Sequence, residues 1–239
     1  MKTCDFNDIN IVYEDNHLLV VVKPQMLPTC PDASGDDDLL TVLKRYLVEK
    51  YNKTGEAYLG LVHRLDRPTG GVMVFAKTSK AAARLAESIS TGEFEKKYLA
   101  ITHGSMRDKR GVLKNGLLKD EAKNEVYCVP IATEGAKIAV LEYKTMEEKK
   151  EGLTLVDVKL VTGRSHQARV QLATQGTPIF GDQKYGKGKT LAGYNLALWA
   201  YELKFPHPTT KEKLVFRVYP PIEEVPWKFF DIPTKLAIK

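Results

Sequence analysis

Short β-type runs joined by tight turns constrain the fold of this chain more than any other feature. Two such runs, at 11–13 and 18–22, flank Asp15-Asn16 and predict a hairpin. A second hairpin is expected from 196–205 and 213–218, around the turn sequence PHPTTKE. Because hairpins dominate and strands do not alternate regularly with helices, the pattern predicts an α+β fold, with a mixed, largely antiparallel sheet and packed helices.

Three helices and four further strands complete the expected fold. Apolar residues at helical spacing follow the acidic run DDD and predict a helix over 38–51. A second helix is expected after a cap at Thr78 or Ser79, and a short third one between Ser165 as N-cap and Gly176 as stop. The strands are expected at 71–76, 96–102, 136–145 and 153–161, and 104–135 as loops with short strands.

The absence of repeats and long linkers predicts one domain over 1–239, with a core at about 11–218. Only about ten residues precede the first expected strand, so no separate N-terminal module is expected. No apolar run approaches the roughly 18 to 20 residues of a membrane span, and the polar N-terminus does not resemble a signal peptide. We therefore expect a cytoplasmic protein with no membrane partner.

The cysteines and histidines are few, and none of them occur at the short spacings of metal-binding motifs. The three cysteines show no CxxC spacing, and the five histidines show no HExxH or other paired spacing. The sequence therefore predicts neither a disulfide framework nor a metal site.

Positive charge is concentrated beyond the first quarter of the chain. The net charge is +6 overall, but residues 1–60 carry 6 basic and 10 acidic side chains, whereas residues 61–120 carry 12 and 6. Such an asymmetry suits a polyanionic partner such as nucleic acid.

The stretch HRLDRPTGG at 63–71 is the most specific local motif. Its Pro and Gly residues place Asp66 on a tight loop that enters the apolar run VMVF. An isolated Asp in this position can simply cap the turn, although loops held by rigid elements often carry function. Two other motifs fail: GKGKT at 186–190 has Gln183 where a phosphate loop needs Gly, and Ser165-His166 lacks the G-x-S-x-G elbow of hydrolases.

Three polar clusters and their flanks, taken in order, resemble the RluA-type family of RNA pseudouridine synthases. The clusters are HRLD at 63–66, EKKY at 95–98 and GRSHQAR at 163–169. The flanks are YEDNHLLVVVKP, KKYLAITHG, LVTGRSHQARVQLATQGTPIFGDQKYG and LALWAYELKFPHP, so the resemblance runs from about 11 to 218. One departure is Gly70, where the family usually has Ser, which removes a hydroxyl that can brace the loop. The accessory RNA-binding module of larger relatives is expected to be absent.

The resemblance implies that uridine within an RNA chain is isomerised to pseudouridine without a cofactor. Asp66 matches the family's catalytic aspartate, and the sequence leaves open whether it attacks sugar or base or abstracts a sugar proton. The target base must be flipped out of the RNA stack. Tyr98 matches the tyrosine that stacks on the flipped uracil and helps to remove the proton from carbon 5. Arg169 matches the basic residue of the site, and we hypothesise that it pairs with the Asp66 carboxylate.

The same resemblance implies RNA contacts from basic residues. Arg64 is expected to fill the space of the flipped base or to hold a phosphate, and His63 to do either or merely to pack. Further phosphate contacts are expected from Arg67, Lys77, Lys96, Lys97, Arg164, Lys184 and Lys187. Ribosomal RNA is favoured over transfer RNA, DNA is not expected, and the default state is a monomer. The segments 25–38 and 104–135 are expected to choose the substrate.

An alternative from another class is a non-catalytic RNA-binding or ribosome-assembly factor on the same fold. Binding alone does not require Asp66, Tyr98 and Arg169 together, so their joint presence favours the enzyme.

Overall fold

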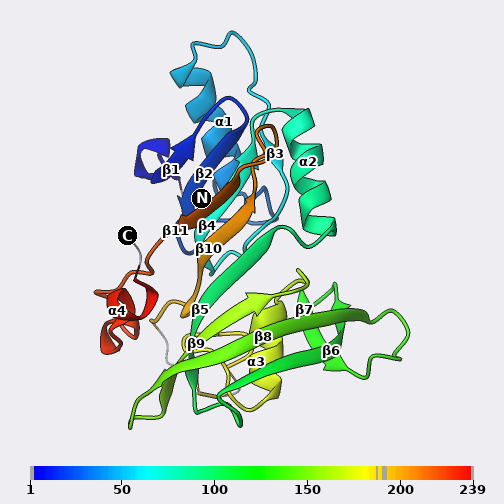
Figure 1. Ribbon diagram of the computed structural model, residues 1–239, viewed down its shortest axis with the longest axis vertical. Helices are drawn as coiled ribbons and strands as arrows, with labels where there is room; N and C mark the ends of the chain where they lie inside the picture. Colours follow the sequence, from blue (N-terminus) through cyan, green and yellow to red (C-terminus); the bar gives the residue numbers. More distant parts are fainter. Residues whose placement is uncertain (1–2, 187, 190–192, 238–239) are drawn as a thin grey trace. The chain divides into compact units, whose positions relative to one another are not determined.

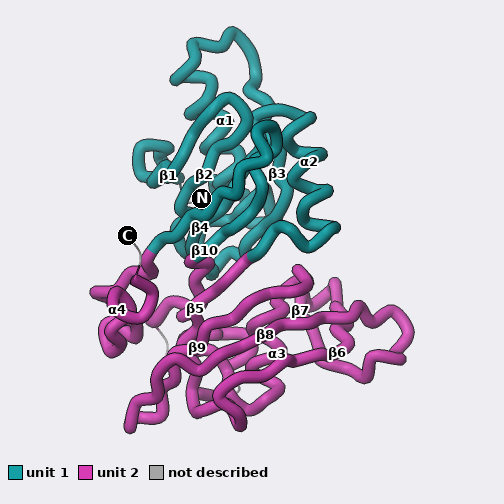
Figure 2. The backbone as a smooth tube through the Cα atoms, viewed as in Figure 1, with its two compact units in different colours: residues 1–95, 202–218 teal, residues 96–201, 219–239 magenta. Residues whose placement is uncertain are grey.

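The computed structural model describes residues 3–186, 188–189 and 193–237, which form two compact units (Figure 2). Unit 1 comprises residues 1–95 and 202–218, and unit 2 comprises residues 96–201 and 219–239. The prediction of an α+β fold with a largely antiparallel sheet is confirmed. The one-domain expectation stays a prediction, and Lys187 lies outside the described residues.

Unit 1 is built on strands in the order β1-β2-β4-β10-β11, with β3 also paired to β4 (Figure 1). The β1–β2, β2–β4, β3–β4 and β10–β11 pairs are antiparallel, and both predicted hairpins are confirmed. The strands are β1 (Ile11–Glu14), β2 (Leu18–Lys23), β3 (Gly60–Leu61), β4 (Gly70–Ala76), β10 (Leu198–Pro206), of which residues 202–206 belong to unit 1, and β11 (Lys213–Arg217). The helices are the 3-10 helix η1 (Phe6–Asp8), α1 (Leu39–Lys50) and α2 (Ser79–Ser90).

The core of unit 1 lies on both faces of β2 and β4. On one face, Val20 and Val74 pack in the same apolar cluster as Leu85 of α2. Every residue of β4 and nearly every residue of β2 is buried, which is why both strands read as unbroken apolar runs. The two helices begin where the sequence predicted, because Asp38 and Thr78 accept hydrogen bonds from backbone N–H groups of the first turn.

Unit 2 contains strands in the order β5-β9-β8-β6-β7, with antiparallel pairing throughout. Helix α3 packs across β6 and β7, and its Val170 joins a cluster with Leu117, Val126 and Ala139 (Figure 1). The strands are β5 (Glu95–His103), β6 (Arg110–Asp120), β7 (Glu125–Val129), β8 (Lys137–Glu148) and β9 (Leu153–Leu160). The helices are α3 (Gln167–Thr174), the 3-10 helix η2 (Trp227–Phe229) and α4 (Ile232–Leu236).

Two local predictions in unit 2 are wrong. Within the segment 104–135, where loops with short strands were expected, β6 is instead a long strand of 11 residues, because it gains its partner β8 from farther along the chain. Ser165 does not cap α3. The N-cap is His166, with φ +52°, and the side chain of Gln167 instead accepts a hydrogen bond from the Arg164 N–H at 3.0 Å. The predicted stop holds, since Gly176 has φ +81°.

Within the described ranges, no helix combines the length and apolar character that crossing a membrane requires. The same ranges contain no cluster of three or more His, Cys, Asp or Glu side chains suited to a metal ion.

Candidate active site

The loop that carries Asp66 is a tight turn between β3 and β4 in unit 1. The Thr69 N–H donates to the main-chain carbonyl of Asp66 at 2.9 Å and closes the turn. Gly71 then has φ +126°, which other residues rarely adopt, so the second Gly of TGG is required by the backbone. Leu65 is buried and Asp66 is half-buried. The turn therefore anchors the loop and leaves Asp66 at its boundary with solvent.

The segment 23–29 braces this loop from a distance of about forty residues in sequence. The Thr29 hydroxyl donates to the Leu65 carbonyl at 2.8 Å and accepts from the Leu65 N–H at 3.3 Å. The Met26 N–H donates to the Arg67 carbonyl at 2.9 Å. The backbone on both sides of Asp66 is thus hydrogen-bonded to one segment, which restricts the positions that its carboxylate can take.

Lys23, at the end of β2, adds a buried positive charge to the same loop. Its side chain is 0% exposed, and its ammonium donates to the carbonyls of Pro24 at 3.0 Å, Leu27 at 2.7 Å and Arg67 at 3.1 Å. Burial lowers the pKa of Lys23 to about 7, against the attraction of the Asp66 carboxylate, which acts to raise it. The sequence predicted no role for Lys23. The available signal was a lysine at the end of an apolar strand, directly before Pro24.

The two residues that precede Leu65 differ in environment. Arg64 is exposed, and it has no ion-pair partner among the residues that the structure describes. The Nε2 of His63 accepts a hydrogen bond from the Val74 N–H at 3.2 Å, and its ring lies 5.4 Å from that of Phe94. These contacts favour packing for His63, whereas the Arg64 side chain is exposed to solvent.

Two of the expected phosphate contacts are engaged with carboxylates inside unit 1. Arg67 forms an ion pair with Asp36 and donates to the Ser34 hydroxyl at 2.9 Å. Lys77 donates to Glu14 at 2.7 Å and is 12% exposed. Contact with RNA at either residue would have to compete with these partners, so their roles as phosphate contacts stay predictions.

In unit 2, Tyr98 lies in β5 opposite Val158 of β9 and is 6% exposed. Its neighbours Lys96 and Lys97 are both half-buried, and burial lowers the pKa of Lys96. Lys97 lies directly opposite Lys159 across the β5–β9 ladder. The part of β5 that precedes Tyr98 is therefore basic.

Arg169 lies in α3 with its guanidinium buried against Asp182. Its Nε and Nη2 each donate to a different carboxylate oxygen of Asp182 at 2.8 Å. The ring centroid of Tyr185 lies 5.2 Å from the central guanidinium carbon. The bonds from Arg169 and from two backbone N–H groups hold the pKa of Asp182 below its usual value, although burial acts to raise it. The stretch GDQKYG contributes to the family resemblance, but the sequence predicted no role for Asp182 or Tyr185.

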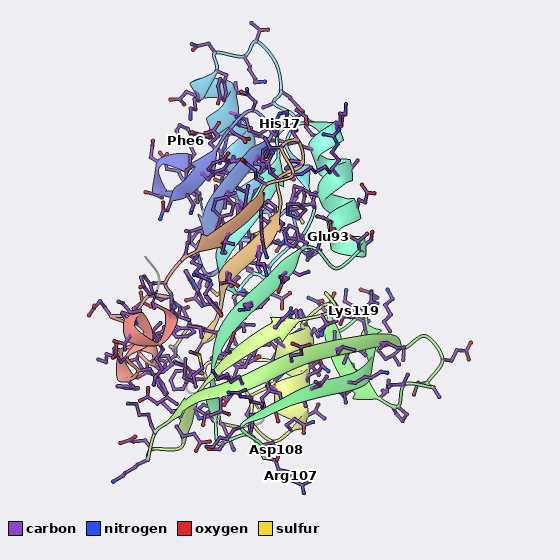
Figure 3. All side chains as sticks on the ribbon, in the orientation of Figure 1. Phe6, His17, Glu93, Arg107, Asp108 and Lys119 are labelled. Carbon is purple, nitrogen blue, oxygen red and sulfur yellow. The ribbon has the colours of Figure 1, made fainter. Side chains whose placement is uncertain are left out.

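A groove of 360 Å³ opens in unit 2 beside the segment that leads into α3. Lys119, labelled in Figure 3, lines it together with Lys137 and Arg164. Arg164 is exposed, and its Nε donates to the Ile138 carbonyl at 3.1 Å. The ammonium of Lys184 donates to the Asn124 carbonyl at 2.8 Å, in the turn between β6 and β7. The groove is lined by basic side chains that suit an anionic ligand, with the acidic Glu121 also in its wall.

Each unit thus assembles part of the expected site. The HRLD loop with Lys23 belongs to unit 1, and Tyr98 and Arg169 belong to unit 2. The meeting of these two parts, and the pairing of Arg169 with Asp66, stay predictions.

Comparisons by sequence and by structure find related proteins of one kind. The model of a family described as RNA pseudouridylate synthase matches residues 17–174, which include Asp66, Tyr98 and Arg169. The uncharacterized RNA pseudouridine synthase YhcT of Bacillus subtilis is 36% identical over 213 residues, 88% of this chain and 68% of that protein. Ribosomal large subunit pseudouridine synthase D of Vibrio cholerae is 35% identical over 231 residues, 91% and 69% of the two chains. The structure of human RNA pseudouridylate synthase domain containing 4 has a TM-score of 0.74 at 27% identity, covering 89% of this chain and 88% of that one.

Proposed function

Since this chain belongs to the RNA pseudouridylate synthase family, we propose that it converts particular uridines of structured RNA into pseudouridine without a cofactor. Members of this RluA-type family are isomerases that act on RNA. Relatives from Vibrio cholerae and Xanthomonas campestris carry the name ribosomal large subunit pseudouridine synthase D, which supports ribosomal RNA as the substrate rather than transfer RNA.

The proposed reaction requires an ionised carboxylate that is held in a fixed position. The N1–C1′ bond of uridine breaks, the uracil turns, and a C5–C1′ bond forms while carbon 5 loses its hydrogen and N1 gains one. Asp66 is the group that starts this sequence, as nucleophile or as base. The observation that carries the proposal is its loop, whose backbone is held on both sides of Asp66 by the segment 23–29. Such preorganisation means that the carboxylate need not be ordered at the moment of reaction.

The remaining roles follow from the chemistry of a flipped base. Removing uracil from the RNA stack costs a few kcal/mol, which stacking on a side chain offsets. Tyr98 provides that ring and assists the loss of the proton from carbon 5. Arg169 stabilises the carboxylate of Asp66 or the charge that develops on the uracil. Arg64, which is exposed beside Leu65, fills the space that the base vacates or holds a phosphate.

The test is tritium release from RNA that carries uridine tritiated at carbon 5, because isomerisation must expel that hydrogen. We expect release by the wild type from bulk ribosomal RNA and none by Asp66→Asn. Asp8→Asn, which removes an exposed carboxylate from η1 of the same unit, is the matched control and should release tritium like the wild type. Release from bulk transfer RNA alone would move the substrate to that class.

A non-catalytic RNA-binding factor on the same fold is the second candidate. It would bind RNA but release no tritium from either RNA class, and Asp66→Asn would leave its RNA affinity unchanged. Tritium release by the wild type excludes it.

A further inference from the structure

The charge of Arg169 is deeply enclosed in unit 2. Its side chain is 7% exposed, and the Asp182 side chain that meets it is 0% exposed. A buried guanidinium is costly unless it is paired and hydrogen-bonded. Asp182 meets that need through two parallel bonds of 2.8 Å, to Nε and to Nη2. This bidentate geometry fixes the guanidinium plane as well as its position.

Asp182 is itself held by the turn that follows it. Its Oδ1 accepts hydrogen bonds from the backbone N–H groups of Lys184 and Tyr185, both at 3.0 Å. The carboxylate therefore meets donors on two sides and cannot rotate without losing one set of bonds. The same turn brings Tyr185 back over the guanidinium, with its ring centroid 5.2 Å from the central carbon of Arg169.

The hydroxyl of Tyr185 is anchored at the far end of the ring. It accepts from the Val126 N–H of β7 at 2.9 Å and lies 2.7 Å from the Nδ1 of His166, the N-cap residue of α3. The ring is thus tied to two elements, and it covers one face of the guanidinium. The Asp182 carboxylate fixes the plane of the Arg169 guanidinium, and the Tyr185 ring limits its movement out of that plane.

The bidentate bond also decides which edge of Arg169 is presented. A guanidinium has five N–H donors, and Asp182 uses the edge formed by Nε and Nη2. The remaining N–H donors lie on the edge formed by Nη1 and Nη2. A change of either partner would rotate this edge while leaving the charge in the protein.

We propose that Asp182 and Tyr185 are positioning residues that aim the Nη1–Nη2 edge of Arg169 at the reacting groups. This inference rests on the proposed function of Arg169. It predicts that replacing Asp182 or Tyr185 slows turnover while RNA binding persists, since a misplacement of about 1 Å can cost roughly 100-fold in rate.

The experiment measures the single-turnover rate of tritium release at saturating RNA, the Kd for RNA and the melting temperature of each variant. We expect Asp182→Asn to lose about 100-fold in rate with Kd within about twofold of the wild type. Tyr185→Phe keeps the ring over Arg169 and should lose less than Tyr185→Leu. Glu202→Gln is the matched control, because it disrupts another ion pair with a buried carboxylate, that with Arg217, and should lower only the melting temperature.

A double variant separates positioning from mere stabilisation. If Asp182 acts through Arg169, then Arg169→Ala and Arg169→Ala with Asp182→Ala should have the same rate. A further loss in the double variant, or a wild-type rate in folded Asp182→Asn, would overturn the proposal. If Asp182→Asn does not fold, equal rates for Tyr185→Leu and the wild type would overturn it. A wild-type rate for Arg169→Ala would instead refute the role of Arg169 in the proposed function, and the inference with it.

Discussion

Lys23 offers the sharpest test of how the Asp66 loop is held, because its ammonium titrates inside the protein. The side chain is 0% exposed and donates to three carbonyls, one of them that of Arg67 in the loop. Burial lowers its pKa from 10.5 to about 7, and the nearby Asp66 carboxylate offsets part of that effect. The perturbation is Lys23→Met, which keeps a long side chain but removes the titrating group.

The sign of the pH dependence follows from the lowered pKa. Below pH 7, folded and unfolded chains both bind the proton, so the cost of burying the charge is fully present. Between pH 7 and 10.5 the folded chain has released the proton and the unfolded chain still binds it. The free energy of unfolding therefore rises there by about 1.4 kcal/mol per pH unit. The wild type should gain about 2 kcal/mol relative to Lys23→Met between pH 7 and pH 9, because the folded chain is only half deprotonated at pH 7.

The assay is urea unfolding of both proteins at pH 6, 7, 8 and 9, together with NMR titration of the lysine Cε signals. The difference between the two proteins should be constant below pH 7 and should then grow in favour of the wild type. Asp66→Asn should lower the pKa of Lys23 further, because the carboxylate acts to raise it. A difference that stays flat from pH 7 to 9, or a Lys23 signal that titrates above pH 10, refutes the reasoning.

Three further predictions address the same unit. Arg64→Ala should weaken RNA binding and reduce the slope of log Kd against log salt by about 1 in filter-binding assays, whereas Lys80→Ala, which removes an exposed lysine of α2, should leave turnover unchanged. Glu14 has a pKa lowered to about 2 by bonds from two lysines and two tyrosines that outweigh burial. Glu14→Gln should therefore cost about 2 kcal/mol of unfolding free energy at pH 7, a loss that fades as the pH falls from 4.5 to 2 in acid unfolding. Thr29→Val leaves the Leu65 carbonyl without its hydroxyl donor and should cost about 1 kcal/mol of unfolding free energy in urea while slowing tritium release; an unchanged rate would separate this bond from catalysis.

The elements that local pattern determines were predictable from the sequence. The first hairpin and the helices after Asp38 and Thr78 follow from turn residues, caps and apolar spacing. The strand β6 was not, because its outer face is charged and it contains two glycines, so its pairing with β8 is decided by tertiary packing rather than by propensity. The two-residue strand β3 is too short to leave a periodic signal.

The residues of the candidate site also differ in whether a sequence motif or only the folded environment reveals them. The resemblance located Asp66, Tyr98 and Arg169 by their motifs, and the family match covers all three. It gave no account of Lys23, because burial of a lysine depends on carbonyls such as that of Arg67, 44 residues away in the chain. It also missed the Arg169–Asp182 pair, since nothing in the spacing of 13 residues specifies a bidentate bond.

Under the proposed function, Asp66 and Arg169 are each held by a buried charged group that takes no part in the reaction itself. Lys23 donates to the backbone beside Asp66, and Asp182 fixes the plane of the Arg169 guanidinium. Lys23 donates to backbone carbonyls, and Asp182 accepts from backbone N–H groups as well as from Arg169. Neither residue is among the groups proposed to react. Groups held in this way need not reorganise when charge moves on the uracil, so their contribution belongs to the transition state. Variants of Lys23 and Asp182 should therefore reduce the rate of the chemical step, whereas exposed cations such as Arg64 should govern how tightly RNA is bound.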